Sequence, residues 1–116
     1  MSMESDLYAI LVAKCPRVFP DTAAALTASP YVIYQQIGGQ VINPLDNSAP
    51  GVRNSRMIVR VWSTKRTEAV TLMDQIEDAM RAATAFEALP QAAKFNTYDE
   101  DLKLYSSEQE FDFWYR

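Results

Sequence analysis

Apolar residues near the start of the chain recur every three or four positions, which is the spacing of a helix with one buried side. Leu7, Ile10 and Leu11 carry this repeat. Ser2 stands just before it, where a side-chain oxygen can accept from the free N–H groups of a first helical turn. The pattern predicts a helix over residues 3–14 with this one side against a core.

A second and longer helical repeat covers about residues 65–83. We expect Ser63 or Thr64 to cap this helix, because either hydroxyl precedes the first periodic position. At ~1.5 Å per residue such a helix is long enough to cross a four-stranded sheet. Its apolar positions are Ala69, Leu72, Met73, Ile76, Ala79, Met80 and Ala83.

Other segments alternate apolar and polar residues, as a strand with two unlike faces does. Clear alternation runs through residues 31–42, 55–63 and 107–116. Residues 94–106 predict a hairpin of two short strands around an acidic turn, and residues 17–21 predict an edge strand or an extended connector.

Periodicity is lost between the first two long strands. Residues 43–55 contain two Pro, one Gly, three Asn and an Asp. Loops of this length are uncommon in compact domains, so we expect a long flexible loop that is either a plain hairpin tip or a segment that becomes ordered on a partner. The pair Gly38-Gly39 predicts a bulge or bend in the strand that precedes this loop.

These elements predict a single α+β domain over residues 1–116. Short turns and one long loop between strands favour a mainly antiparallel sheet of about four strands, with two helices packed on one face. The other face would stay partly apolar. Tyr34, Trp62 and Trp114 are the aromatic residues that we expect there.

Charge and composition exclude several classes of function. The net charge is −4, with 15 acidic and 11 basic residues, which disfavours specific binding of nucleic acid. No apolar run approaches the ~18–20 residues that cross a bilayer, so no membrane association is expected. The negative net charge fits a soluble intracellular protein. Glu4 and Asp6 stand where a secretory signal would be basic, so we expect the N-terminal residues to be part of the folded structure and not a targeting segment.

The residues needed for many reactions are missing. The chain has no histidine, which excludes Ser-His-Asp and Cys-His nucleophiles and metal sites that need His. No Gly-rich phosphate loop is present, and Cys15, the single cysteine, is expected to be buried and inert. The acids Asp99, Glu100 and Asp101 lack the Gly and distal Glu of a calcium loop, so they predict a turn. No catalytic residue, cofactor or metal is predicted.

Four segments occur in a characteristic order: "LYAIL…CPRVFP" at 7–20, "SPYVIYQQIG" at 29–38, "RMIVRVWSTKRTEAVTLMDQI" at 56–76 and "FDFWY" at 111–115. This series resembles the tail-completion, or tail-terminator, proteins of long-tailed bacteriophages and prophages. The most specific parts are the strand ending in Trp62 with the helix after it, and the closing aromatic strand. Residues 43–55 do not align with the family pattern.

The resemblance implies a structural protein with no enzymatic activity and no cofactor. It implies a ring, typically a hexamer, on the head-proximal end of the tail tube, where it stops tube polymerisation and offers a surface for head–tail joining. The expected partners are further copies of the chain, the tail tube protein and a neck or head-completion protein. The expected location is the bacterial host cytoplasm during assembly and then the virion tail.

A ring of identical subunits needs two different patches that meet head to tail. We expect a basic strand face on one subunit to meet an acidic helix side on the next, with a tryptophan supplying buried area. The candidate interface residues are Arg53, Arg56, Arg60, Trp62, Asp74, Glu77, Asp78 and Trp114.

Other functions use the same features. A different neck or connector component would rely on similar contacts, and a small cytoplasmic ligand-binding or regulatory α+β domain would need a polar pocket. An enzyme is the least favoured alternative. Its carboxylates would be Glu108, Glu110 and Asp112, which alternate with aromatic residues and so are expected to face solvent.

Overall fold

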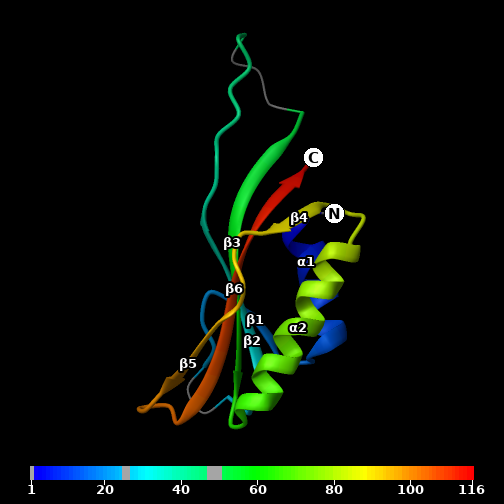
Figure 1. Ribbon diagram of the computed structural model, residues 1–116. Coiled ribbons are helices and arrows are strands. Elements are labelled where there is room, and N and C mark those ends of the chain that lie inside the picture. The colour runs from blue at the N-terminus through cyan, green and yellow to red at the C-terminus, as the bar shows by residue number, and fades with distance from the viewer. Residues whose placement is uncertain (1, 25–26, 47–50) are drawn as a thin grey trace.

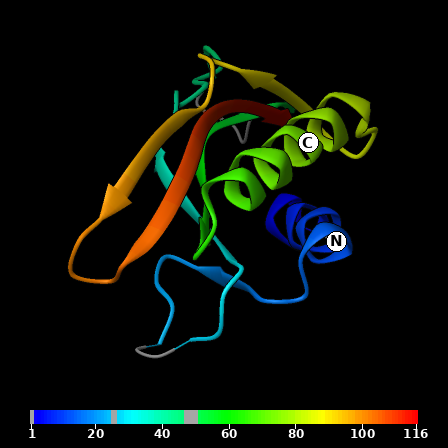
Figure 2. The same ribbon diagram turned by 60° about the horizontal axis from the view of Figure 1, so that its bottom comes forward.

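A single curved sheet runs the length of the molecule, and two helices lie together on one of its faces (Figure 1, Figure 2). The structure is a computed structural model that describes residues 2–24, 27–46 and 51–116. The elements are α1 (Met3–Lys14), β1 (Val18–Pro20), β2 (Tyr31–Gly38), β3 (Arg53–Ser63), α2 (Arg66–Ala82), β4 (Glu87–Pro90), β5 (Phe95–Asp99) and β6 (Leu104–Tyr115). The α+β class predicted from the sequence is confirmed.

The first helix forms where its apolar repeat and its cap predict. The Ser2 hydroxyl accepts from the Ser5 backbone N–H at 3.1 Å, and the Ser5 hydroxyl accepts from the Ser2 N–H at 3.2 Å. These reciprocal bonds satisfy N–H groups that the first turn leaves free. Leu7 and Leu11 are buried, and the buried Cys15 follows at the end of the helix.

The predicted cap of the second helix is wrong. The capping residue is Lys65, whose side chain makes no capping bond. Ser63 remains the last residue of β3, and its buried hydroxyl accepts from the Lys65 N–H at 3.1 Å and donates to Glu68 at 2.5 Å. Ser63 pairs with Tyr105 in the sheet, so it lies two residues before the capping position. Its hydroxyl still connects the strand to the first helical turn through its hydrogen bond with Glu68.

Among the described residues the sheet has six strands, not about four. Its order is β1-β2-β3-β6-β4, and β5 pairs with another part of β6. All pairs are antiparallel except β1 with β2. The estimate was low because β4, in the sequence "EALP", has little strand propensity of its own and forms by pairing with Trp114 through Phe111 of β6.

The predicted loop over residues 43–55 ends earlier than expected. Arg53, Asn54 and Ser55 belong to β3 and pair with residues 113–115 of β6. The predicted end of the loop is wrong because the polar side chains of these residues have low strand propensity, and pairing with β6 makes them a strand. Residues 47–50 of the loop lie outside the described residues. The predicted irregularity at the glycine pair is confirmed as a register shift between Gln36 and Gly38.

The core lies between the helices and one face of the sheet. Met57, Val59 and Val61 of β3 are fully buried there. Tyr34 also lies on this side and belongs to the core, so its assignment to the open face is wrong. The register explains the error: Tyr34 pairs with Val59, whereas Trp62 pairs with Tyr31, so Tyr34 and Trp62 lie on opposite faces.

An arm extends from one end of the sheet. It consists of residues 39–46 and 51–52, which follow β2 and lead into β3, and it rises beyond the helices at the top of Figure 1. With this arm the molecule measures 51 Å along its longest axis and 26 and 25 Å across. We refer to these residues as the arm.

Candidate functional site

The predicted basic strand face lies on the open face of the sheet, directly opposite acids of β6. Arg60 pairs with Glu108 at 2.5 Å, and the two residues face each other in the β3–β6 register. Arg56 lies opposite Asp112 and donates to the side-chain oxygen of Gln91 at 3.2 Å. The arginine charges of this face are therefore partly offset inside the chain itself.

Aromatic side chains cover one end of the open face. Trp62 stacks on Tyr31 with ring centroids 6.4 Å apart, and Phe19 meets the edge of the Tyr31 ring at 6.5 Å. Trp114 lies near the opposite end of β6, half-buried and opposite Asn54. The two predicted tryptophans are thus on the same face but far apart along the sheet.

Two acids of the predicted helix stripe already have partners. Asp74 accepts from Lys94 at 2.6 Å. Glu77 accepts from the Gln109 amide at 2.6 Å and from Arg81 at 3.3 Å, and the Gln109 hydrogen bond is the main reason that the pKa of Glu77 lies below its ordinary value. Asp78 is exposed and has no partner among the residues that the structure describes.

The structure separates the two predicted charged patches. Arg56 and Arg60 lie on the open face, whereas α2 covers the other face of the sheet (Figure 2). Arg53 alternates with Ser55 and Met57 and therefore lies on that other face, apart from the two arginines with which it was predicted to form one patch. The two patches therefore cannot touch within one chain. They could meet only between two subunits, as in a head-to-tail contact. Arg53 lies where the arm joins β3, is exposed, and has no side-chain partner among the described residues.

A hydrogen-bonded residue holds the base of the arm. The Asn54 side chain accepts from the Gln40 N–H at 2.8 Å and donates to Asp112 at 2.8 Å and to the Phe113 carbonyl at 3.0 Å. Gly39 passes so close that a Cβ there would lie 2.8 Å from the Asn54 carbonyl oxygen, and its φ is +139°. The backbone direction at the start of the arm is therefore set by packing that only glycine permits.

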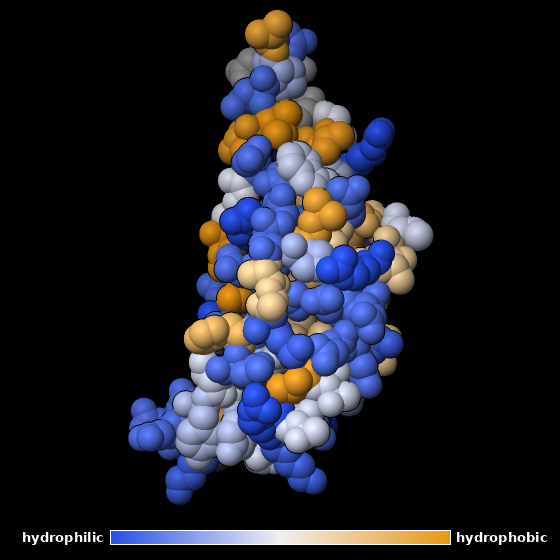
Figure 3. Space-filling model, viewed as in Figure 1, coloured by the Kyte–Doolittle hydropathy of each residue, from blue (hydrophilic) through white to orange (hydrophobic). Residues whose placement is uncertain are grey.

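Exposed apolar side chains gather at both ends of the molecule. In the arm, Val41 is 83% exposed and Leu45 is fully exposed, and Figure 3 shows hydrophobic side chains along this end. At the opposite end, Phe95, Tyr98 and Leu102 of the β5–β6 hairpin are also exposed, Phe95 by 60%. Sequence reasoning missed these residues, although apolar Val41 and Leu45 in a Pro- and Asn-rich stretch were a usable signal.

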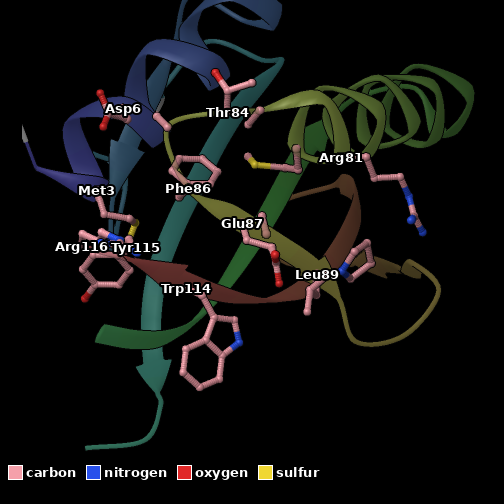
Figure 4. Close-up of a pocket in the computed structure, with 15 residues that line it drawn as sticks. Met3, Asp6, Arg81, Thr84, Phe86, Glu87, Leu89, Trp114, Tyr115 and Arg116 are labelled. Atoms are coloured by element: carbon pink, nitrogen blue, oxygen red, sulfur yellow. The ribbon is translucent and has the colours of Figure 1, made fainter. Parts of the chain in front are cut away.

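A cavity of about 750 Å³ opens near the base of the arm. Figure 4 shows its walls: Met3 and Asp6 from α1, Phe86 and Glu87 at the start of β4, and Arg81 from α2. Trp114 and Tyr115 of β6 complete it, and Tyr115 also borders the hollow beneath Val41 and Ile42 of the arm. The surface exposed to this cavity is more polar than apolar, and the charged residues Asp6, Arg81, Glu87 and Arg116 contribute to its lining.

The acidic turn of the β5–β6 hairpin is a structural turn. The Asp99 carboxylate accepts from the Leu102 N–H at 2.9 Å, as expected for an Asp that closes a turn. Within residues 2–24, 27–46 and 51–116, no three metal-binding side chains of the Cys, Asp or Glu type gather at one point. None of the described helices is long and apolar enough to cross a membrane.

Comparison with known proteins identifies a family for nearly all of this chain. A family model described as "Tail completion protein gp17" matches residues 4–116. The match includes all of α1 except Met3, the other described elements and the arm. No curated protein sequence matches the chain significantly.

Proposed function

The chain belongs to the tail completion protein gp17 family of phage tail proteins, and we propose that it forms a ring on the head-proximal end of the tail tube. In this proposal the ring stops the addition of tube subunits and presents a surface for head–tail joining. Six copies is the expected number. Assembly takes place in the bacterial host cytoplasm, and the ring remains in the virion tail.

The observation that supports this function best is the exposure of large apolar side chains toward both ends of the long axis. Val41 and Leu45 are exposed on the arm, and Phe95 and Leu102 are exposed on the β5–β6 hairpin. A tail terminator has to contact a neighbouring subunit and two unlike partners along the tail, so it needs such surfaces on more than one side.

The predicted interface residues should contribute unequally to binding between subunits. Four of them already have partners within the chain, so we expect them to affect the orientation of a contact more than its affinity: Arg56, Arg60, Asp74 and Glu77. Arg53 and Asp78 keep charges available for a neighbour. Trp62 and Trp114 are half-buried on the open face and offer further apolar area on assembly.

The first test is the mass of the purified chain by light scattering across a concentration series, beside negative-stain images of the same samples. Closed rings of about six times 13.1 kDa are expected. Dimers that stop at two copies would contradict the proposal, because an isologous pair leaves no free patch for a ring.

The second test is the length of tubes formed by the tail tube protein of the same phage. Adding the chain during polymerisation should shorten the tubes in proportion to its concentration and place density at one tube end. A heat-denatured sample of the chain is the control. An unchanged length distribution together with bare tube ends would overturn the function, whether or not the chain forms rings in solution.

A further inference from the structure

A shallow groove lies between the end of α1 and the first half of α2. It has a volume of about 490 Å³ and exposes more apolar than polar surface. Pro30 and Leu72 contribute to its lining, together with the methyl-bearing side chains of Thr67 and Thr71. An exposed apolar hollow of this kind favours contact with an apolar side chain of a partner.

The rim of this groove is basic. Lys14 and Lys65 line it and are exposed, and neither side chain has an ion-pair partner among the described residues. Arg17 adjoins the groove, because its side chain donates to the Pro30 carbonyl at 2.9 Å. Among the described lining residues the acid is Glu68, which already accepts from a hydroxyl of β3. In a chain of net charge −4, this local excess of cations fits an occupant that carries a carboxylate.

The arm presents side chains that suit such a groove. Val41 is 83% exposed and Leu45 is fully exposed. Asp46 follows Leu45 and is the only charged residue in the sequence from 39 to 52, so the arm brings a carboxylate beside its apolar side chain. The bonds of Asn54 hold the base of the arm, so the arm loses less conformational entropy on binding than a free loop would.

The arm and the groove of one chain cannot meet. From the base of the arm, β3 leads toward the opposite end of the molecule, where α2 begins (Figure 1). Its 11 residues span roughly 36 Å at ~3.3 Å per residue. The arm itself extends away from this strand, beyond the helices (Figure 1). An arm that fills such a groove must therefore belong to another copy of the chain.

A second copy also offers the acidic turn of its β5–β6 hairpin, where Leu102 is exposed. This hairpin lies toward the same end of the molecule as the start of α2 (Figure 1). Two patches at one end can engage each other reciprocally and stop at two copies, whereas patches at opposite ends repeat from copy to copy. A ring therefore favours the arm over the hairpin as the occupant of the groove.

We propose that each subunit inserts Leu45 of its arm into the groove of a second copy of this chain, with Asp46 facing Lys14 and Lys65. This inference rests on the proposed ring and names its contact. Arm and groove are different patches, so the contact is heterologous and can repeat around a closed ring. The β5–β6 hairpin stays free for a partner along the tail.

Cross-linking of engineered thiols tests the contact directly. The variant Leu45→Cys/Thr71→Cys carries one thiol on the arm and one in the groove, both at exposed positions where the fold tolerates a substitution. Cys15 is 1% exposed, so the natural thiol does not react with a short bis-maleimide. The double variant should give a ladder of covalent oligomers up to the closed ring.

Matched variants separate this contact from random collisions and from the hairpin. Leu45→Cys alone and Thr71→Cys alone should give dimers at most, and Leu102→Cys/Thr71→Cys should give no ladder. The samples include the chain alone up to its solubility limit and the chain with polymerising tube protein. Absence of the ladder from the Leu45→Cys pair in all of them overturns the proposal, and so does an equal or stronger ladder from the Leu102→Cys pair.

Charge reversal in the cross-linking variant provides a second readout. Lys65→Glu should lower the yield of covalent oligomers on the order of threefold, because the carboxylate of the arriving arm then meets an acid. The fold should be retained, since a carboxylate is favourable at the start of a helix. Lys103→Glu makes the same change at an exposed position of the hairpin and should leave the yield unchanged. Equal yields from the two variants count against the contact.

The outcomes distinguish this inference from the proposed function. Normal rings and shortened tubes without the ladder would leave the function standing and remove the arm contact. A ladder without any effect on tube length would keep the contact and remove the terminator function.

Discussion

At the scale of single residues, a few polar side chains connect elements that sequence order keeps far apart. Asn54 bonds to the arm through Gln40 and to β6 through Asp112 and Phe113. Glu77 reaches from α2 to Gln109 of β6, and Gln109 in turn donates to the Ala92 carbonyl at 2.8 Å. Such bonds matter because a buried group left without its partner costs about 1–3 kcal/mol.

Asn54→Ala should lower the free energy of unfolding by about 1–3 kcal/mol, because the Phe113 carbonyl and the Gln40 N–H lose a buried partner. Amide exchange at Gln40 should also become faster. Chemical denaturation and hydrogen exchange measure the two effects. Asn54→Asp is the informative companion: it keeps the acceptor for Gln40 but sets a carboxylate against Asp112, and it should destabilise at least as much.

Glu77→Gln should lower stability at neutral pH by about 0.5 kcal/mol, since the carboxylate is partly exposed and its hydrogen bonds are screened. The pKa of Glu77 is held below its ordinary value of 4.5, so this contribution is fully present above pH 4.5. It is lost as the pH falls through the lowered pKa of the folded state.

Urea unfolding of both proteins at pH 7 and at pH 3 measures this dependence. The two curves should differ at pH 7 and approach each other at pH 3. Asp78→Asn removes an exposed carboxylate from the same helix and serves as the matched control. If Glu77→Gln changes the free energy of unfolding equally at both pH values, the charge of the Glu77 carboxylate does not contribute to its interaction with Gln109.

At the scale of elements, those with a regular apolar repeat were predictable and those formed by pairing were not. The helix over residues 3–14 and the core face of β3 follow from the spacing of leucines and valines alone. The strand β4 and the start of β3 at Arg53 escaped prediction because Glu, Asn and Ser have low strand propensity, and only hydrogen bonds to β6 make them strands.

The candidate site was less predictable than the fold for the same reason. A single sequence does not state which strands face each other, so it could not show that Glu108 pairs with Arg60 or that Lys94 pairs with Asp74. It placed Tyr34 on the wrong face, and it gave no sign that Met3, Phe86 and Trp114 border one cavity.

Ile76→Ala should reduce the free energy of unfolding by about 2–5 kcal/mol, because the Ile76 side chain is fully buried between α2 and the sheet and its loss leaves a cavity. Gln75→Ala, at the exposed neighbouring position, should change it by less than about 0.5 kcal/mol. Urea denaturation followed by circular dichroism measures both. Similar values for the two variants would contradict the packing of α2 described above.

At the scale of the whole molecule, apolar side chains are exposed at both ends of an axis 51 Å long. The β5–β6 hairpin exposes Phe95, Tyr98 and Leu102, far from the arm, and we expect it to contact a partner along the tail. The separation predicts that the two contacts can be removed one at a time.

Phe95→Ser/Leu102→Asp should leave the ring intact and remove one partner contact. The substituted side chains are exposed, so the fold should be retained within about 0.5 kcal/mol. Ring mass, tube length and head–tail joining are measured separately, and either tube length control or joining should fail while the other persists. Loss of neither function would exclude the hairpin as a docking surface, and loss of the ring would place it between subunits.

The position of β6 in the sheet has a consequence for synthesis. Three strands, β3, β4 and β5, take β6 as a neighbour, and all three precede it in the chain. On the ribosome none of them has this neighbour until β6 emerges, so the sheet of the nascent chain stays open until residues 104–115 have been made. A chain that stops before β6 therefore lacks the shared strand and cannot complete the sheet.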